Sequence, residues 1–198
     1  MAESLFEPLT EQPVLPRPAG SSPAPGPVRC HERQGLCLTQ VIARPGKARE
    51  VARILGLRLP ERPGTTETDG EIVVYCLRPR DWLILSPDGD GRRGGTAQEA
   101  RRRLAGLAAA IDQSHGRVVL RLSGEGARRL LQGGVSVDLD SALFVPGAMA
   151  QTAINGIAVL IHGTETDVLD VQVARSFAAD LAAWLGHSGV TFERPAAP

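Results

Sequence analysis

The stretch from Asp112 to Thr152, DQSHGRVVLRLSGEGARRLLQGGVSVDLDSALFVPGAMAQT, carries the signals that decide the fold of this chain. Residues 117–122 alternate in the period of a half-buried strand. A glycine turn then leads into a short helix over 125–132, which ends at Gly133-Gly134 because glycine readily takes the left-handed conformation of a helix end. The Pro146-Gly147 turn introduces the next strand. The stretch therefore predicts a strand, a helix and a further strand in that order.

The same order of elements occurs twice along the chain. The first pass is predicted as strand 36–42, helix 46–55, strands 72–75 and 82–85, and a helix over 96–111 with Leu104, Leu107, Ala108 and Ile111 on one face. The second pass is predicted as strand 117–122, helix 125–132, strands 150–154 and 157–161 joined at Asn155-Gly156, strand 168–173, and helix 175–186 with Phe177, Leu181, Trp184 and Leu185 on one stripe.

This duplication predicts an α+β fold of two related β-α-β-β-α halves, residues 29–111 and 112–192. Each half is expected to be an antiparallel sheet with helices on one face, and the two are expected to share a core near Ile111. Trp184 should be buried against the second sheet, with Trp82 in the corresponding place in the first half.

The two ends of the chain fall outside these halves. Residues 1–28 contain seven of the 15 prolines, so they cannot form a helix or a central strand and should be disordered in isolation. Leu5, Phe6 and Leu9 precede most of these prolines, so the segment is either a frayed terminus or a tail that orders on a partner. Residues 193–198 form a C-terminal tail.

Composition limits the classes of function. Hydrophobic residues make up 42% of the chain, and 22 basic residues balance 22 acidic ones. A net charge of zero removes the positive field of a nucleic-acid binder and suits a subunit. The sequence shows neither an apolar run long enough for a membrane span nor the basic leader typical of a signal peptide, so neither is expected. The three cysteines have no CxxC spacing, which favours reduced thiols in the cytoplasm.

Several local patterns resemble sites without completing one. Gly124-Glu125-Gly126 follows a strand as a dinucleotide-binding turn does, but Arg129 stands where the third glycine is needed. Cys30, His31 and Cys37 lack a fourth zinc ligand. His115 beside Ser114 cannot form a catalytic relay, and Asp138 with Asp140 is more typical of turn formation than of a carboxylate pair. We therefore predict no catalytic, cofactor-binding or metal-binding residue in this chain.

The central stretch also carries a family pattern. The motif SxGRxxLRLSGxxAR, a DL pair and FxPGxxAQT occur here in order. The matching residues are Ser114, Gly116-Arg117, Leu120-Arg121-Leu122-Ser123-Gly124, Ala127-Arg128, Asp138-Leu139, Phe144, Pro146-Gly147 and Ala150-Gln151-Thr152. From about Val28 to Phe192 the chain resembles the gamma subunit of heterotetrameric sarcosine oxidase. It is more distantly similar to the aminomethyltransferase (T-protein) of the glycine cleavage system, with its folate-binding fold.

The resemblance implies a partnership and a reaction. Its partners would be the alpha (large), beta and delta subunits, carrying FAD, FMN, NAD and tetrahydrofolate, with no cofactor on this chain. The assembly would demethylate sarcosine oxidatively, releasing the one-carbon unit as formaldehyde or onto tetrahydrofolate. The aminomethyltransferase has acidic residues after its hairpin turn, whereas no acid lies between Asn155 and Glu165 here. The chain alone is therefore expected to be non-catalytic.

Two alternatives are open from the sequence. The chain could be a stand-alone folate-binding or methyl-transferring protein, which the acid-free hairpin argues against. It could also be the equivalent subunit of a complex that oxidises N-methylglutamate or dimethylglycine, and the subunit would not reveal which amine is the substrate.

Overall fold

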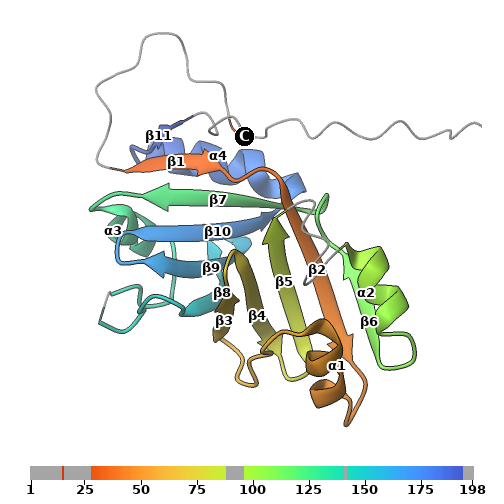
Figure 1. Cartoon of the computed structure of the whole chain (residues 1–198). Helices are drawn as coiled ribbons and strands as arrows, with labels where there is room; N and C mark the ends of the chain where they lie inside the picture. Colours follow the sequence, from red (N-terminus) through yellow and green to blue (C-terminus); the bar gives the residue numbers. More distant parts are fainter. Residues whose placement is uncertain (1–14, 16–27, 88–95, 141, 194–198) are drawn as a thin grey trace, which may run out of the picture.

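Two β-sheets packed on each other organise the chain, and each carries helices on its other face (Figure 1). The computed structural model describes residues 15, 28–87, 96–140 and 142–193. The predicted α+β class with antiparallel sheets is confirmed: every strand pairing in these ranges is antiparallel except a short parallel one at one edge.

The first-half sheet has five strands in the order β3-β4-β5-β2-β6. Their bounds are β2 Leu36–Ala43, β3 Thr66–Asp69, β4 Ile72–Arg78, β5 Asp81–Pro87 and β6 Ala108–Asp112. Helices α1 (Ala48–Leu55) and α2 (Ala97–Arg103) pack on its outer face through Val51, Leu55 and Ala100, together with Leu104 directly after α2. The Thr96 hydroxyl accepts a hydrogen bond from the Glu99 N–H and so caps the start of α2.

The second-half sheet has six strands in the order β11-β1-β7-β10-β9-β8. Their bounds are β1 Arg29–Glu32, β7 Arg117–Ser123, β8 Met149–Ile154, β9 Ile157–Glu165, β10 Val168–Ala174 and β11 Thr191–Phe192. Its outer face is covered by α3 (Ala127–Gln132) and by α4 (Ala178–His187), which follows a 3-10 turn at Arg175–Phe177. The β8–β9 hairpin turns at Asn155 and Gly156, with φ of 47° and 83°, as the Asn-Gly signal predicts.

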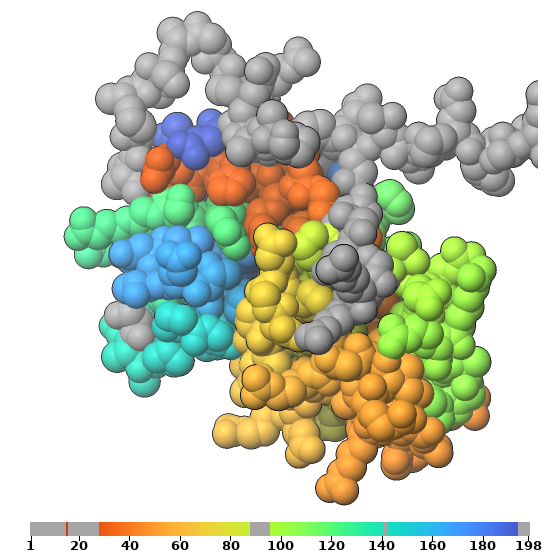
Figure 2. Space-filling model, viewed as in Figure 1, coloured from red at the N-terminus to blue at the C-terminus, as the bar shows by residue number. Residues whose placement is uncertain are grey.

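The two sheets share one internal order. Strands β3-β4-β5-β2 of the first sheet correspond to β8-β9-β10-β7 of the second, so the predicted relation between the halves is present in the topology. The place beside β2 is taken by β6, whereas the place beside β7 is taken by β1. Residues 29–32, which the sequence division assigns to the first half, thus complete the second sheet, and Figure 2 shows them beside β7 and β11.

The helix expected over 96–111 is wrong beyond Arg103. Gly106 has a φ of 79°, which ends helical geometry, and Ala108–Asp112 then pairs with β2 as an edge strand. Ile111 lies on the surface with 39% exposure, so the shared core is not near it. The two halves instead meet through a cluster of buried side chains from both sheets: Leu38, Tyr75, Leu77, Leu83, Leu85, Val119, Met149 and Leu160.

The predicted tryptophan positions are only partly correct. Trp184 is half-buried rather than buried, and its ring lies against Gly134, where an added Cβ would sit 2.6 Å from ring atom Cζ2. Phe177 is 52% exposed and does not belong to the buried stripe of α4. Trp82 is buried, but it lies on strand β5 and not on a helix, and its indole N–H donates to the Pro60 carbonyl. It therefore holds no place equivalent to Trp184.

The predicted tails lie almost wholly outside the described residues. Within residues 1–27 only Leu15 is described, and its half-buried side chain packs on the outer core of the second sheet. In the C-terminal tail only Glu193 is described, and its N–H bonds to the Cys30 carbonyl. Over the parts of the chain that the structure describes, no helix has the length and apolar character needed to cross a membrane.

Candidate functional site

The layer between the two sheets holds the chemically interesting side chains. Alternation along β7, β9 and β10 sends one set of residues towards the helices and the other into this layer. Strand register sorts the inward set into three rows across the second sheet. The first row is His31, Arg121, Asp170, His162 and Met149; the second is Val119, Gln172, Leu160 and Gln151; the third pairs Arg117 with Ala174 and Ala158 with Ala153.

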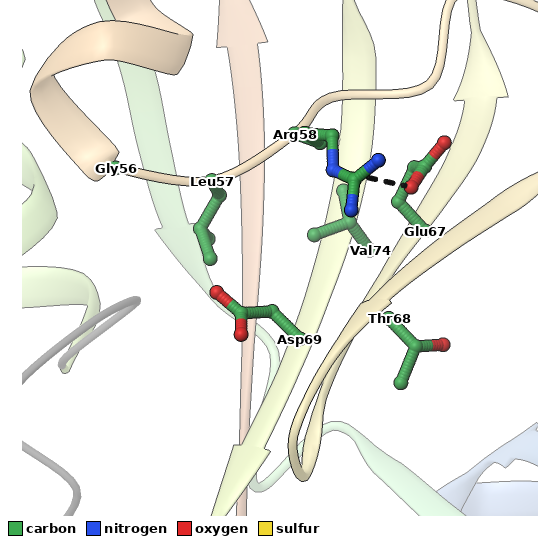
Figure 3. A pocket seen from close by; sticks show the side chains of 7 residues that line it. All are labelled: Gly56, Leu57, Arg58, Glu67, Thr68, Asp69 and Val74. Atoms are coloured by element: carbon green, nitrogen blue, oxygen red, sulfur yellow. Dashed lines mark ion pairs between the residues drawn. The ribbon is translucent and has the colours of Figure 1, made fainter.

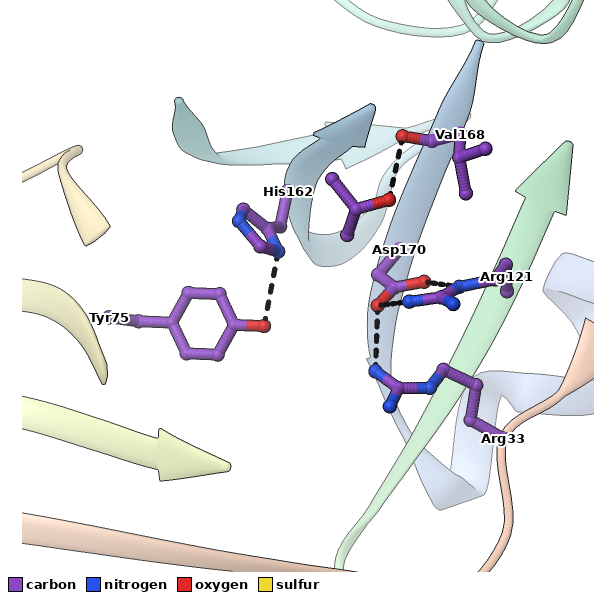
Figure 4. A network of polar contacts seen from close by, with 7 residues as sticks. Arg33, Tyr75, Arg121, His162, Val168 and Asp170 are labelled. Carbon is purple, nitrogen blue, oxygen red and sulfur yellow. Dashed lines mark hydrogen bonds and ion pairs between the residues drawn. The ribbon is translucent and has the colours of Figure 1, made fainter. Parts of the chain in front are cut away.

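The first row contains an ion-pair network around Asp170 (Figure 4). The Asp170 side chain is 1% exposed. Arg121 donates to both of its oxygens, with Nε–Oδ1 and Nη2–Oδ2 distances of 2.7 and 2.9 Å. Arg33, which follows β1, adds a bond of 2.9 Å from Nη1 to Oδ2. Two guanidinium groups therefore neutralise one buried carboxylate, which leaves it poorly suited to act as a base.

A hydrogen bond between Tyr75 and His162 connects the two sheets at the same level. The Tyr75 hydroxyl lies 3.3 Å from His162 Nδ1, and the rings meet edge to face with centroids 5.1 Å apart. Burial lowers the pKa of His162 to about 4 and raises that of the Tyr75 phenol above its usual range. At neutral pH the hydrogen bond therefore joins a neutral phenol to a neutral imidazole.

The second row is less well satisfied. The Gln172 side chain is fully buried between Val119 and Leu160, and neither atom of its amide makes a hydrogen bond within the described chain. A buried amide without partners carries a desolvation cost of about 1–3 kcal/mol. The first row reaches the other sheet through His162 and Tyr75, and neither row contains a Ser or Cys nucleophile.

The third row opens into a cavity of about 470 Å³. Its lining comes from β4, the turn before β7, the β8–β9 hairpin and the end of β10: Leu77, Gln113, Gly116, Arg117, Gln151, Thr152, Ala158, Val159, Leu160 and Ala174. The side chains of Ala158 and Leu160 face this space, while that of Val159 points to the helix side, so part of the acid-free run noted in the sequence lines a cavity. Among the described lining residues none is a carboxylate.

A second cavity of about 210 Å³ lies between the end of α1 and strand β3 (Figure 3). Arg58 and Glu67 flank it with their charged groups 3.8 Å apart, and their side chains are 86% and 40% exposed. An ion pair this exposed is worth little, because water screens both charges. This cavity is small and open, so we do not assign it a ligand.

The candidate zinc ligands are not brought together. Cys30 and His31 lie on β1, whereas Cys37 lies on β2 in the other sheet. Burial raises the pKa of the Cys30 thiol to about 12, so it stays protonated. Across the described residues no group of three or more potential ligands is close enough to hold a metal ion.

The remaining sequence candidates form turns, as expected. Asp138 Oδ1 accepts from the Asp140 N–H, and Asp140 Oδ1 accepts from the Ala142 N–H, which confirms the turn-forming prediction. Asp112 bonds the Ser114 N–H in the same way, ahead of His115. A Cβ on Gly126 would meet the Val28 side chain at 3.4 Å, so this glycine allows packing within the chain.

Sequence reasoning missed the Asp170 network because its members are scattered along the chain. One signal was available: Arg121 and Asp170 are each flanked by apolar residues within a predicted strand. A charge at an inward strand position needs a partner on a neighbouring strand, because its burial is otherwise costly. Their pairing in register between β7 and β10 meets that requirement.

The fold defines the structural class of this chain. It is the fold of glycine cleavage system aminomethyltransferase T from Bartonella henselae, which superimposes at a TM-score of 0.62 with 16% identity over 85% of this chain and 48% of that one. The chain thus spans about half the length of that protein. A chain of the heterotetrameric sarcosine oxidase from Corynebacterium sp. U-96 superimposes at a TM-score of 0.74, with 22% identity over 81% of this chain and 83% of that one.

The family follows from the sequence itself. The sarcosine oxidase, gamma subunit family model matches residues 40–190, and the chain belongs to this family. The resemblance carried by residues 112–152 is thereby confirmed. No match was found among curated protein sequences.

Proposed function

We propose that this chain is the non-catalytic gamma subunit of a sarcosine oxidase-type complex. The complex converts sarcosine to glycine with hydrogen peroxide and either formaldehyde or 5,10-methylenetetrahydrofolate. The alpha (large), beta and delta subunits are its partners in the cytoplasm, and they hold the FAD, FMN, NAD and tetrahydrofolate. Support comes from family membership and from the likeness to a chain of a heterotetrameric sarcosine oxidase.

The observation that carries the non-catalytic role is the composition of the 470 Å³ cavity. Transfer of a one-carbon unit on folate needs a group that moves a proton at the reacting nitrogen. Here the hairpin offers the side chains of Ala158 and Leu160, and the described lining contains no carboxylate. The buried acid of the adjacent layer, Asp170, is already bonded to Arg33 and Arg121. The chain therefore contributes a rigid body to the complex and leaves the chemistry to its partners.

Reconstitution tests this proposal. The four subunits are co-expressed with and without this chain, and sarcosine-dependent peroxide formation is measured on the material that elutes as a heterotetramer. Omission should abolish the heterotetramer and reduce activity, while the isolated chain should be colourless and inactive. Full assembly and activity without this chain would rule out the subunit role. Parallel assays with N-methylglutamate and dimethylglycine identify the amine.

The folate-binding alternative has its own measurement. Calorimetry of the isolated chain with tetrahydrofolate should give no binding. A micromolar dissociation constant, equivalent to about 8 kcal/mol, together with methylene transfer by the chain alone, would favour the stand-alone enzyme instead.

A further inference from the structure

Arg117 is a half-buried cation, and no acidic side chain of the described chain forms an ion pair with it. It lies at the start of β7 in the third row, opposite Ala174. Its guanidinium makes no hydrogen bond or ion pair with any other residue that the structure describes, and burial lowers its pKa. Arg121, four residues further along the same face of β7, is bonded twice to Asp170. One strand thus carries a neutralised arginine and an unneutralised one.

The surroundings of Arg117 leave room for a ligand. Small residues at Gly116, Ala158 and Ala174 line the cavity of about 470 Å³ beside it, a volume within the range of about 300–1,000 Å³ typical of small-molecule sites. The wall is also held in place. The side-chain amide of Gln151 donates to the Leu77 carbonyl at 2.9 Å, which ties β8 to β4 across the two sheets.

We propose that this cavity binds a carboxylate group and that Arg117 supplies its counter-charge. A guanidinium presents a planar fork of donors that matches the two oxygens of a carboxylate. Arg117 is the one charged side chain among the described lining residues, so the site offers a single positive charge. That charge balances a monoanion, whereas a phosphate dianion would be left half compensated.

The carboxylate has two chemical sources. It belongs either to a small free acid or to an Asp or Glu side chain that a neighbouring subunit inserts into the cavity. The second source rests on the proposed subunit function, and the first does not. The experiment therefore has one arm on the isolated full chain and one on the assembled complex.

In the first arm, the Nε–H resonance of Arg117 is followed by NMR while sodium acetate or sodium glutarate is added. Sodium chloride at equal ionic strength is the reference. A free carboxylate ligand predicts a saturable shift at millimolar concentration, at least about tenfold stronger than with chloride. Arg117→Gln identifies the resonance and should remove the response. Ala174→Leu fills the cavity, keeps the charge and should also remove it, whereas exposed Arg129→Gln should not.

In the second arm, the affinity of the chain for the co-expressed subunits is measured. A carboxylate from a partner predicts that Arg117→Gln weakens assembly by at least about tenfold, while Arg129→Gln changes it less than about twofold. Variants are compared only after thermal unfolding shows that they are folded. If carboxylates fail to shift the resonance and the Arg117→Gln chain assembles with unchanged affinity, the site is refuted while the subunit function stands. If no complex forms with the wild-type chain, the proposed function fails, and the first arm alone decides the site.

Discussion

Acidification should destabilise the fold through His162. This side chain lies on β9 in the layer between the sheets and is 4% exposed. Its pKa is about 4 in the folded chain because burial disfavours the charged imidazolium, against an ordinary value of 6.5. Between these values the unfolded chain binds a proton that the folded chain does not. The stability that depends on a neutral His162 is therefore fully present above pH 6.5 and is lost as the pH falls towards 4.

The magnitude follows from the size of the shift. A fall from 6.5 to about 4 corresponds to a loss of about 3 kcal/mol, out of a typical total of about 5–15. Arg121 and Arg33 face the imidazole and oppose its protonation, while Asp170 favours it. His31 on β1 also has a lowered pKa, chiefly from burial, and contributes in the same direction. A variant is needed to separate the two histidines.

Urea unfolding of the wild type and of His162→Gln separates the contributions of the two histidines. The unfolding is followed by tryptophan fluorescence between pH 4.5 and 7.5, about the range where the imidazole titrates. The glutamine amide keeps an acceptor for the Tyr75 hydroxyl but does not titrate. The variant should be less stable at pH 7, and the difference should shrink by about 2–3 kcal/mol at the acidic end. The pH dependence that both proteins share, including that of His31, cancels in the difference between the two curves. Parallel stability curves would show that His162 is not buried neutral.

Three further predictions concern stability in urea. Asp170→Asn should lower the free energy of unfolding by about 3–5 kcal/mol, because two partly buried guanidiniums lose their counter-charge; a loss below about 1 kcal/mol would contradict the network. Gly134→Ala should cost about 1–3 kcal/mol, since the new Cβ meets the Trp184 ring at 2.6 Å, and adding Trp184→Leu should restore part of it. Arg117→Met should leave the isolated chain as stable as before or more stable, whereas a clear loss would reveal an intramolecular partner for this arginine.

Sequence patterns of a few residues correctly predicted the elements whose conformation those same residues determine. The alternation of residues 117–122 and the Asn155-Gly156 turn each specify a conformation within a few residues, and both were correct. Because the same order of strands and helices occurs twice along the chain, two related halves could be predicted. The helix over 96–111 failed because alanine and leucine at helical spacing also suit an edge strand. Pairing with β2 and the positive φ of Gly106 decide between the two, and both lie outside the apolar pattern.

Pairings between distant segments were not predictable in the same way. Strand β1 is four residues long, and its place beside β7 depends on partners about 90 residues further along the chain. The Tyr75–His162 contact spans 87 residues and joins the two halves. No local pattern marks such contacts, since each residue alone is compatible with a surface position. What the sequence does indicate is a charge inside an apolar strand, and Arg117 and Arg121 share that signal.

The two arginines of β7 show how structural and functional charges differ. Arg121 and Arg117 occupy the same face of one strand, yet the first meets Asp170 in register and the second meets Ala174. A paired charge such as Arg121 joins two strands of its own sheet and has no need of a partner from outside. A half-buried charge with no counter-ion in the described chain has no such role in the isolated protein, because its burial only costs free energy. The carboxylate proposed above, from a ligand or from a partner, would offset that cost. Contact with a ligand or partner should therefore be sought at the third row, beside Arg117.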